Sequence, residues 1–80
     1  MTVLEHHRTA AALHIAKVEL RERERGNHYD ADRAHDRLVD TVEASRWPRT
    51  LLFGVARRLG RERALAVGID RDTVELAVRL

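Results

Sequence analysis

The final stretch of the chain, residues 60–80, places the tightest limit on the fold. In this stretch Ala64 is followed four residues later by Gly68, and Val74 comes six residues after that glycine. Two helices joined by a tight turn need a small residue where they touch, a glycine in the left-handed position and a branched apolar residue in the second helix. The spacing therefore predicts a helix, a sharp turn at Gly68 and a second helix that packs back on the first.

The residues after this glycine fit the same prediction. Ile69 can supply the apolar contact that holds such a turn together. Asp70 stands where the second helix needs a side chain that accepts hydrogen bonds from its free N–H groups. We therefore expect a positive φ angle at Gly68 and a helix that begins directly after Asp70.

This stretch resembles the helix-turn-helix of bacterial and phage DNA-binding regulators, and the resemblance covers residues 60–80 only. It implies that the second helix lies in the major groove of DNA and presents its early residues to base edges. In this sequence those residues, which would contact either bases or a partner, are Arg71, Asp72, Glu75, Leu76 and Arg79.

The positive charge of the chain is concentrated just before the turn. The whole chain carries a formal net charge of +2 at pH 7, whereas residues 48–63 alone carry +4. The arginines of this segment that suit contacts with DNA phosphates are Arg57, Arg58, Arg61 and Arg63. All but one of the 15 basic residues are arginines, which is typical of GC-rich genomes such as those of actinobacteria and their phages.

Three carboxylates on the last expected helix depart from the pattern of DNA-binding regulators. Asp70 is explained as a cap, and Asp72 suits the positive end of the helix dipole. Glu75 has no such structural role, although a glutamate can accept a hydrogen bond from N4 of cytosine. An outward Leu76 is more typical of a protein contact. The alternative function is therefore a non-catalytic protein-interaction or oligomerisation module, acting as an adaptor or structural component.

A long first helix is expected over residues 2–25, ending at Gly26-Asn27. Its apolar residues at helical spacing are Leu4, Ala11, Ile15 and Val18, with Leu13, Ala16 and Leu20 widening the stripe. Two ion pairs, Glu19 with Arg23 and Glu22 with Arg25, are expected to support it. Such a helix would be about 36 Å long, whereas a domain of this size is about 30 Å across. We therefore expect it to span the molecule or to protrude, and to form the interface of a homodimer or higher oligomer.

Two more helices are expected before the turn. One should start after His28 and Tyr29, with Asp30 as its cap, and end near Ser45. Its buried face would comprise Ala31, Ala34, Leu38, Val39 and Val42. The other should run over residues 48–59, after the break at Trp47-Pro48, with Leu51, Leu52, Val55, Ala56 and Leu59 inward.

Single residues near the third helix add two expectations. Trp47 and Phe53 are assigned to the core, and Gly54 is typical of a close crossing with another helix. The sequence thus predicts one all-α domain over residues 1–80. In it, a long antiparallel helical hairpin (residues 1–46) packs on a C-terminal three-helix part that contains the helix-turn-helix-like motif (residues 47–80).

Few residues suit catalysis or metal binding. Ser45 is the only serine, and the chain has no cysteine. The pairs His7/His14 and His28/His35 are each seven residues apart, whereas histidines that share a zinc ion on one helix are usually three or four apart. We therefore expect no enzymatic activity, no metal and no cofactor. The expected partners are DNA, a second copy of the chain or a larger protein.

The cysteine content and the hydropathy pattern also bear on the environment of the protein. A chain without cysteine fits a reducing compartment. The longest apolar runs are far shorter than the roughly 20 residues that a membrane span needs. We therefore expect a soluble cytoplasmic protein that has no contact with the membrane.

Overall fold

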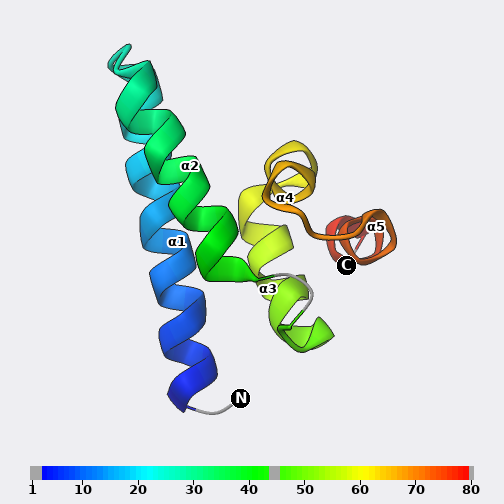
Figure 1. Cartoon of the computed structure of the whole chain (residues 1–80). Coiled ribbons are helices and arrows are strands. Elements are labelled where there is room, and N and C mark those ends of the chain that lie inside the picture. The colour runs from blue at the N-terminus through cyan, green and yellow to red at the C-terminus, as the bar shows by residue number, and fades with distance from the viewer. Residues whose placement is uncertain (1–2, 44–45, 80) are drawn as a thin grey trace.

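The computed structural model describes residues 3–43 and 46–79, which form five α-helices (Figure 1). They are α1 (Val3–Glu24), α2 (His28–Val42), α3 (Arg49–Leu59), α4 (Arg61–Val67) and α5 (Arg71–Arg79). No strand occurs among the described residues, and the all-α prediction is confirmed. Helices α1 and α2 form an antiparallel hairpin, α3 and α4 pack against its side, and α5 packs on α3 and α4 away from the hairpin (Figure 1).

Helix α1 runs along the longest dimension of the molecule. It has 22 residues, which at 1.5 Å per residue make it about 33 Å long. The principal extents of the molecule are 34 × 26 × 19 Å, so α1 spans it as expected. The predicted start at Thr2 lies outside the described residues. Helix α2 has only 15 residues, and the first turns of α1 extend past its end (Figure 1).

The buried face of α1 differs from the predicted one. Its buried residues are Ala12, Ile15, Ala16 and Glu19, which share one side of a helix. The predicted positions Leu4 and Leu20 are 60% and 46% exposed, and Ala11 is exposed as well. Apolar residues occur on almost every side of this helix. Their spacing alone therefore did not determine which side faces the rest of the molecule.

Helix α2 begins at His28, before the predicted start, and Asp30 is not its cap. Asn27 precedes the helix, but its Nδ2 donates a hydrogen bond to Glu22 Oε2 at 2.7 Å and its side chain does not cap the helix. Asp30 lies within the first turn, where a carboxylate suits the helix dipole. The predicted cap is wrong because the helix begins before Asp30, at His28.

The end of α2 also comes earlier than expected. The helix ends at Val42, and Glu43 adopts a left-handed φ of 43° while its N–H donates to Val39 O at 3.2 Å. Ser45, the predicted end, lies outside the described residues. The buried residues of this helix are Ala31, Ala34, Leu38 and Val42, as predicted. Val39 was expected with them, yet it is 37% exposed.

The hydrophobic core contains residues from all five helices. Trp47 is only 6% exposed and belongs to it, as predicted. All the residues expected on the inner side of α3 are buried, namely Leu51, Leu52, Val55, Ala56 and Leu59. Phe53 is half-buried and packs against the core, while the Arg49 guanidinium lies 5.6 Å from its ring centroid.

The expectation for Gly54 is wrong. A Cβ added at this glycine would meet no atom within 4 Å, so no other helix crosses α3 closely at this point. Elsewhere, none of the helices in the described part of the chain is both long and apolar enough to cross a membrane.

Candidate nucleic-acid interface

The turn between α4 and α5 is closed by backbone hydrogen bonds. Gly68 has a φ of 103°, in the left-handed region, which confirms the prediction. Its N–H donates to Leu65 O at 3.1 Å, and the Ile69 N–H donates to Ala64 O at 3.2 Å. This paired pattern is a Schellman motif, in which the residue after the glycine makes the apolar contact. Ile69 is 2% exposed and makes that contact with the core.

Asp70 caps α5 through both of its carboxylate oxygens. Oδ2 accepts the Thr73 backbone N–H at 3.0 Å, and Oδ1 accepts the Thr73 hydroxyl at 2.6 Å. These two bonds hold the pKa of Asp70 below its usual value, with a smaller contribution from the charge of Arg49. Thr73 is almost fully buried, and Arg49 Nε lies 3.3 Å from its oxygen. The cap thus fixes the start of α5 against the start of α3.

Helix α5 is held by one side and exposes the other. Its buried residues Thr73, Val74 and Ala77 face the core, and α5 packs on both α3 and α4. The fully buried Ala64 and Val74 occupy the contact positions that the sequence predicted. The exposed residues of α5 are Arg71, Asp72, Leu76 and Arg79. They are the predicted contact residues apart from Glu75.

Glu75 is half-buried and bound to Arg61 at the start of α4. Its two carboxylate oxygens accept hydrogen bonds from Arg61 Nε at 2.8 Å and from Arg61 Nη2 at 3.1 Å. This two-pronged contact holds the pKa of Glu75 below its usual value. A predicted phosphate contact and a predicted base or partner contact therefore neutralise each other in the free protein.

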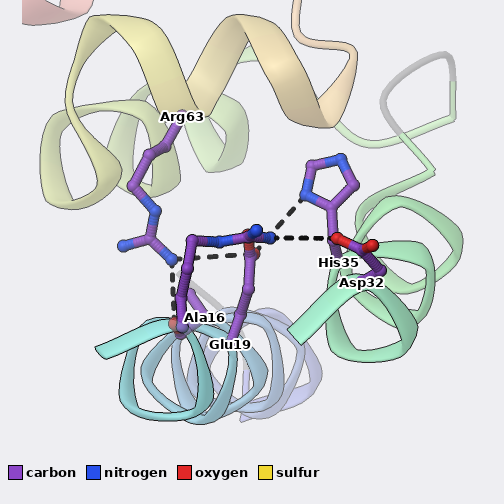
Figure 2. A network of polar contacts seen from close by, with 6 residues as sticks. Ala16, Glu19, Asp32, His35 and Arg63 are labelled. Atoms are coloured by element: carbon purple, nitrogen blue, oxygen red, sulfur yellow. Dashed lines mark hydrogen bonds and ion pairs between the residues drawn. The ribbon is translucent and has the colours of Figure 1, made fainter. Parts of the chain in front are cut away.

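Arg63 points away from α5 and towards α1 (Figure 2). Its Nη2 donates to the carbonyl oxygen of Ala16 at 2.8 Å and lies 3.8 Å from Glu19 Oε1. The guanidinium thus donates a hydrogen bond to a backbone carbonyl in the middle of α1. Arg63 therefore joins α4 to the hairpin.

Arg57 and Arg58, in the last turn of α3, are exposed. Arg58 lines a cavity between α3 and α1 together with Lys17 and Arg63. The four predicted phosphate ligands are thus divided. Arg61 is paired with α5 and Arg63 with α1, whereas Arg57 and Arg58 have no polar partner among the described residues.

A buried carboxylate that the sequence analysis treated only as a local pair joins three helices. The Glu19 side chain is 10% exposed and lies 3.0 Å from Arg23 Nη2, 3.4 Å from His35 Nδ1 and 3.8 Å from Arg63 Nη2 (Figure 2). The expected pair with Arg23 is confirmed, as is the pair of Glu22 with Arg25 at 3.6 Å. Glu19 lies four residues after Ile15 within one turn of Ala16, and this spacing was the available signal that it faces inward.

No group of three or more His, Cys, Asp or Glu side chains among residues 3–43 and 46–79 is arranged to hold a metal ion. His7 and His14 are exposed on α1, and His28 is the first residue of α2. His35 is the histidine that contacts the carboxylate of Glu19.

Comparisons of the chain with protein-family models, with curated proteins and with solved structures found no match. The residues described above therefore carry the functional proposal on their own.

Proposed function

We propose that this protein is a small DNA-binding regulator that inserts α5 into the major groove and acts as a dimer. The observation that carries the proposal is the turn between α4 and α5. Gly68 and the Asp70 cap fix the start of α5, and the buried side of this helix packs on the core. Its opposite side exposes Arg71, Asp72 and Arg79. A helix supported in this way can enter a groove and contact base edges with its exposed residues.

The distribution of charge supports the same proposal. Residues 46–79, which include α3 to α5, contain eight arginines and four carboxylates, a formal net charge of +4. Residues 3–43, which form the hairpin, contain seven basic and nine acidic residues, a net charge of −2. The part with the exposed helix is thus the part that a phosphate backbone attracts.

The contacts of each arginine suggest how the roles divide. Arg57 and Arg58 are exposed and free to reach phosphates, and Arg61 can do so once it leaves Glu75. Arg63 is bound to the backbone of α1, so we assign it to the fold. Arg71, at the start of α5, is placed to approach bases or phosphates first.

A salt titration of binding to a random duplex tests the proposal. The logarithm of the binding constant should fall with the logarithm of salt concentration, with a slope of about −0.9 for each phosphate contact. Replacing both Arg57 and Arg61 by alanine should flatten that slope by about two units and weaken binding to all sequences alike. Arg37→Ala, an exposed change on α2, is the matched control and should leave the slope unchanged. Absence of salt-dependent binding near 100 mM, roughly physiological ionic strength, together with no enriched site in a selection experiment, would end the proposal.

One observation favours a second function, binding of a larger protein partner through α5. Leu76 is 43% exposed on the outward side of this helix, and the neighbouring Glu75 is neutralised by Arg61. An apolar side chain beside a neutral ion pair suits a protein interface better than a groove of DNA. On this alternative, Leu76→Asp abolishes a protein complex, whereas replacement of Arg57 and Arg61 by alanine does not weaken it.

A further inference from the structure

A cavity between the hairpin and the C-terminal part is lined by both apolar and cationic residues, and the DNA-binding proposal uses only Arg58 of them. It has a volume of about 200 Å³ and lies where α1 faces the end of α3 and the start of α4. Its apolar residues include Leu13 and Leu20 from α1 and Leu59 from α3. Its charged residues are Lys17, Arg58 and Arg63, and no carboxylate lines it.

Two of these three cations have no partner of their own. The Nη2 atom of Arg63 is bound to the carbonyl of Ala16, so this side chain is already engaged. Neither Lys17 nor Arg58 forms an ion pair or hydrogen bond with any described residue, and both side chains are exposed. Cations that flank an apolar surface without a counter-ion attract an anion, and the partly apolar surroundings strengthen that attraction.

On the α1 side of the cavity, apolar and cationic side chains lie on the same face of the helix. Leu13, Lys17 and Leu20 are four and three residues apart, so they follow one another along the same face. Leu20 is 46% exposed at the edge of this cavity. An apolar ligand in the cavity would cover this side chain.

We propose that this cavity binds a small organic carboxylate with an apolar body, whose carboxylate pairs with Lys17 and Arg58 and whose hydrocarbon part packs on Leu13, Leu20 and Leu59. The size suits such a ligand, because an engineered apolar cavity of roughly 150 Å³ takes up benzene. The remaining volume accommodates the polar head. This site uses neither α5 nor Arg61 and shares only Arg58 with the proposed phosphate contacts.

The test is a titration of the full, isotope-labelled chain with octanoate, followed by amide NMR shifts. Saturable shifts should be confined to residues 13–20 and 58–63, which border the cavity. Two matched probes isolate the two halves of the ligand: 1-octanol lacks the charge, and acetate lacks the apolar body. We expect each to bind at least about tenfold more weakly than octanoate, which corresponds to about 1.4 kcal/mol.

Variants test whether Lys17 and Arg58 account for the preference for a carboxylate. The double change Lys17→Gln and Arg58→Gln should remove the preference for octanoate over octanol. Arg33→Gln with Arg37→Gln, two exposed arginines of α2 that do not line this cavity, should keep it. Lys17→Glu with Arg58→Glu should reverse the preference, so that octylammonium binds better than octanoate. The unchanged amide spectrum of α5 would show that each variant is folded.

Three results would each overturn the proposal. One is the absence of saturable shifts below the concentration at which octanoate forms micelles. Another is equal affinity for octanoate and octanol in the unmodified protein. The third is a preference for octanoate that survives the loss of both cations. None of these results bears on DNA binding, because no DNA is present in the titration.

Discussion

At the scale of single residues, Gly68 and Gly54 differ in their backbone conformation. Gly68 has a left-handed φ of 103°, whereas Gly54 is helical and a Cβ there would meet open space. Gly68→Val should lower the free energy of unfolding by about 1 kcal/mol or more, because a side chain with a Cβ resists that conformation. Gly54→Ala should raise it by about 0.5–1 kcal/mol, because alanine is the better helix former. Urea unfolding measures both, and a Gly68→Val midpoint equal to that of the wild type would show that the turn tolerates other residues.

The cap of α5 predicts a dependence of stability on pH. The pKa of Asp70 is lowered by hydrogen bonds from the hydroxyl and the backbone N–H of Thr73. The charged carboxylate therefore stabilises the fold above its unfolded-state pKa of about 4, and this contribution is lost as the pH falls through the folded-state value. Asp70→Asn keeps an acceptor but cannot ionise. Its Tm should lie below that of the wild type at neutral pH, and the two should converge in acid. A Tm difference that stays constant with pH would contradict this role.

If DNA is the partner, Glu75 should weaken DNA binding, because its carboxylate is paired with the Arg61 guanidinium that would otherwise contact a phosphate. Glu75→Gln keeps the size of the side chain but removes the charge that holds Arg61 through two hydrogen bonds. The freed guanidinium should tighten binding to every duplex without changing the salt slope, because Arg61 contacts a phosphate in both proteins and only the cost of leaving Glu75 is removed. A base-reading role predicts the opposite, a loss of specificity at one position. Binding to random and selected duplexes separates the two, with Glu62→Gln on the outer side of α4 as the control.

The residues of this site differ in how far their roles could be predicted from the sequence. Gly68 and Asp70 were predictable because a turn and a cap depend on neighbours within a few residues. Arg63 was not, because it donates to a carbonyl 47 residues earlier in the chain. A long cationic side chain can bind whatever acceptor the tertiary structure brings near, so its sequence context does not distinguish a phosphate ligand from a structural bond.

At the scale of the helices, Glu19 and Arg63 should couple α4 to the hairpin. Glu19 is nearly buried and Arg63 is one third exposed, at 3.8 Å from each other. Arg63→Met should lower the free energy of unfolding by about 1–2 kcal/mol, less than for a fully buried pair because water still reaches the guanidinium. Arg57→Met, an exposed change without a partner, should stay within about 0.5 kcal/mol. Chemical unfolding of both variants, and of each combined with Glu19→Gln, gives the coupling. Strict additivity would show that the contact carries no energy.

The boundaries of the helices were predicted unevenly for a physical reason. Helix α3 begins within one residue of the expected position because proline fixes the backbone at its start. Helix α2 begins earlier than expected, at His28, and the Asn27 side chain before it is bound to Glu22 on the preceding helix and does not cap α2. Proline restricts its own backbone, so its effect can be predicted locally. The hydrogen bond of Asn27 depends on the folded hairpin, which brings Glu22 near it.

At the scale of the whole molecule, the hairpin and the three-helix part were predictable, but the way they join was not. Periodicity and breaks define each helix, and short connections make neighbouring helices antiparallel. The junction depends on the buried side of α1, which carries Glu19 among small apolar residues. From the sequence alone, a charged residue such as Glu19 is assigned to the surface. Its burial is explained only by its partners Arg23, His35 and Arg63, two of which come from other helices.

The uncovered end of α1 leads to the last prediction, which concerns assembly. Helix α1 is seven residues longer than α2, so about 10 Å of it extends past its partner. Two large apolar residues in this part, Val3 and Leu4, are 72% and 60% exposed. A small domain often covers such residues by association. We expect sedimentation to show a homodimer or higher oligomer at about tens of micromolar, a range in which modest dimers form. Leu4→Asp should shift it to monomer by placing a charge in the interface. Val39→Asp, at an exposed site on α2, should not. A wild-type protein that sediments as a clean monomer would rule out this assembly.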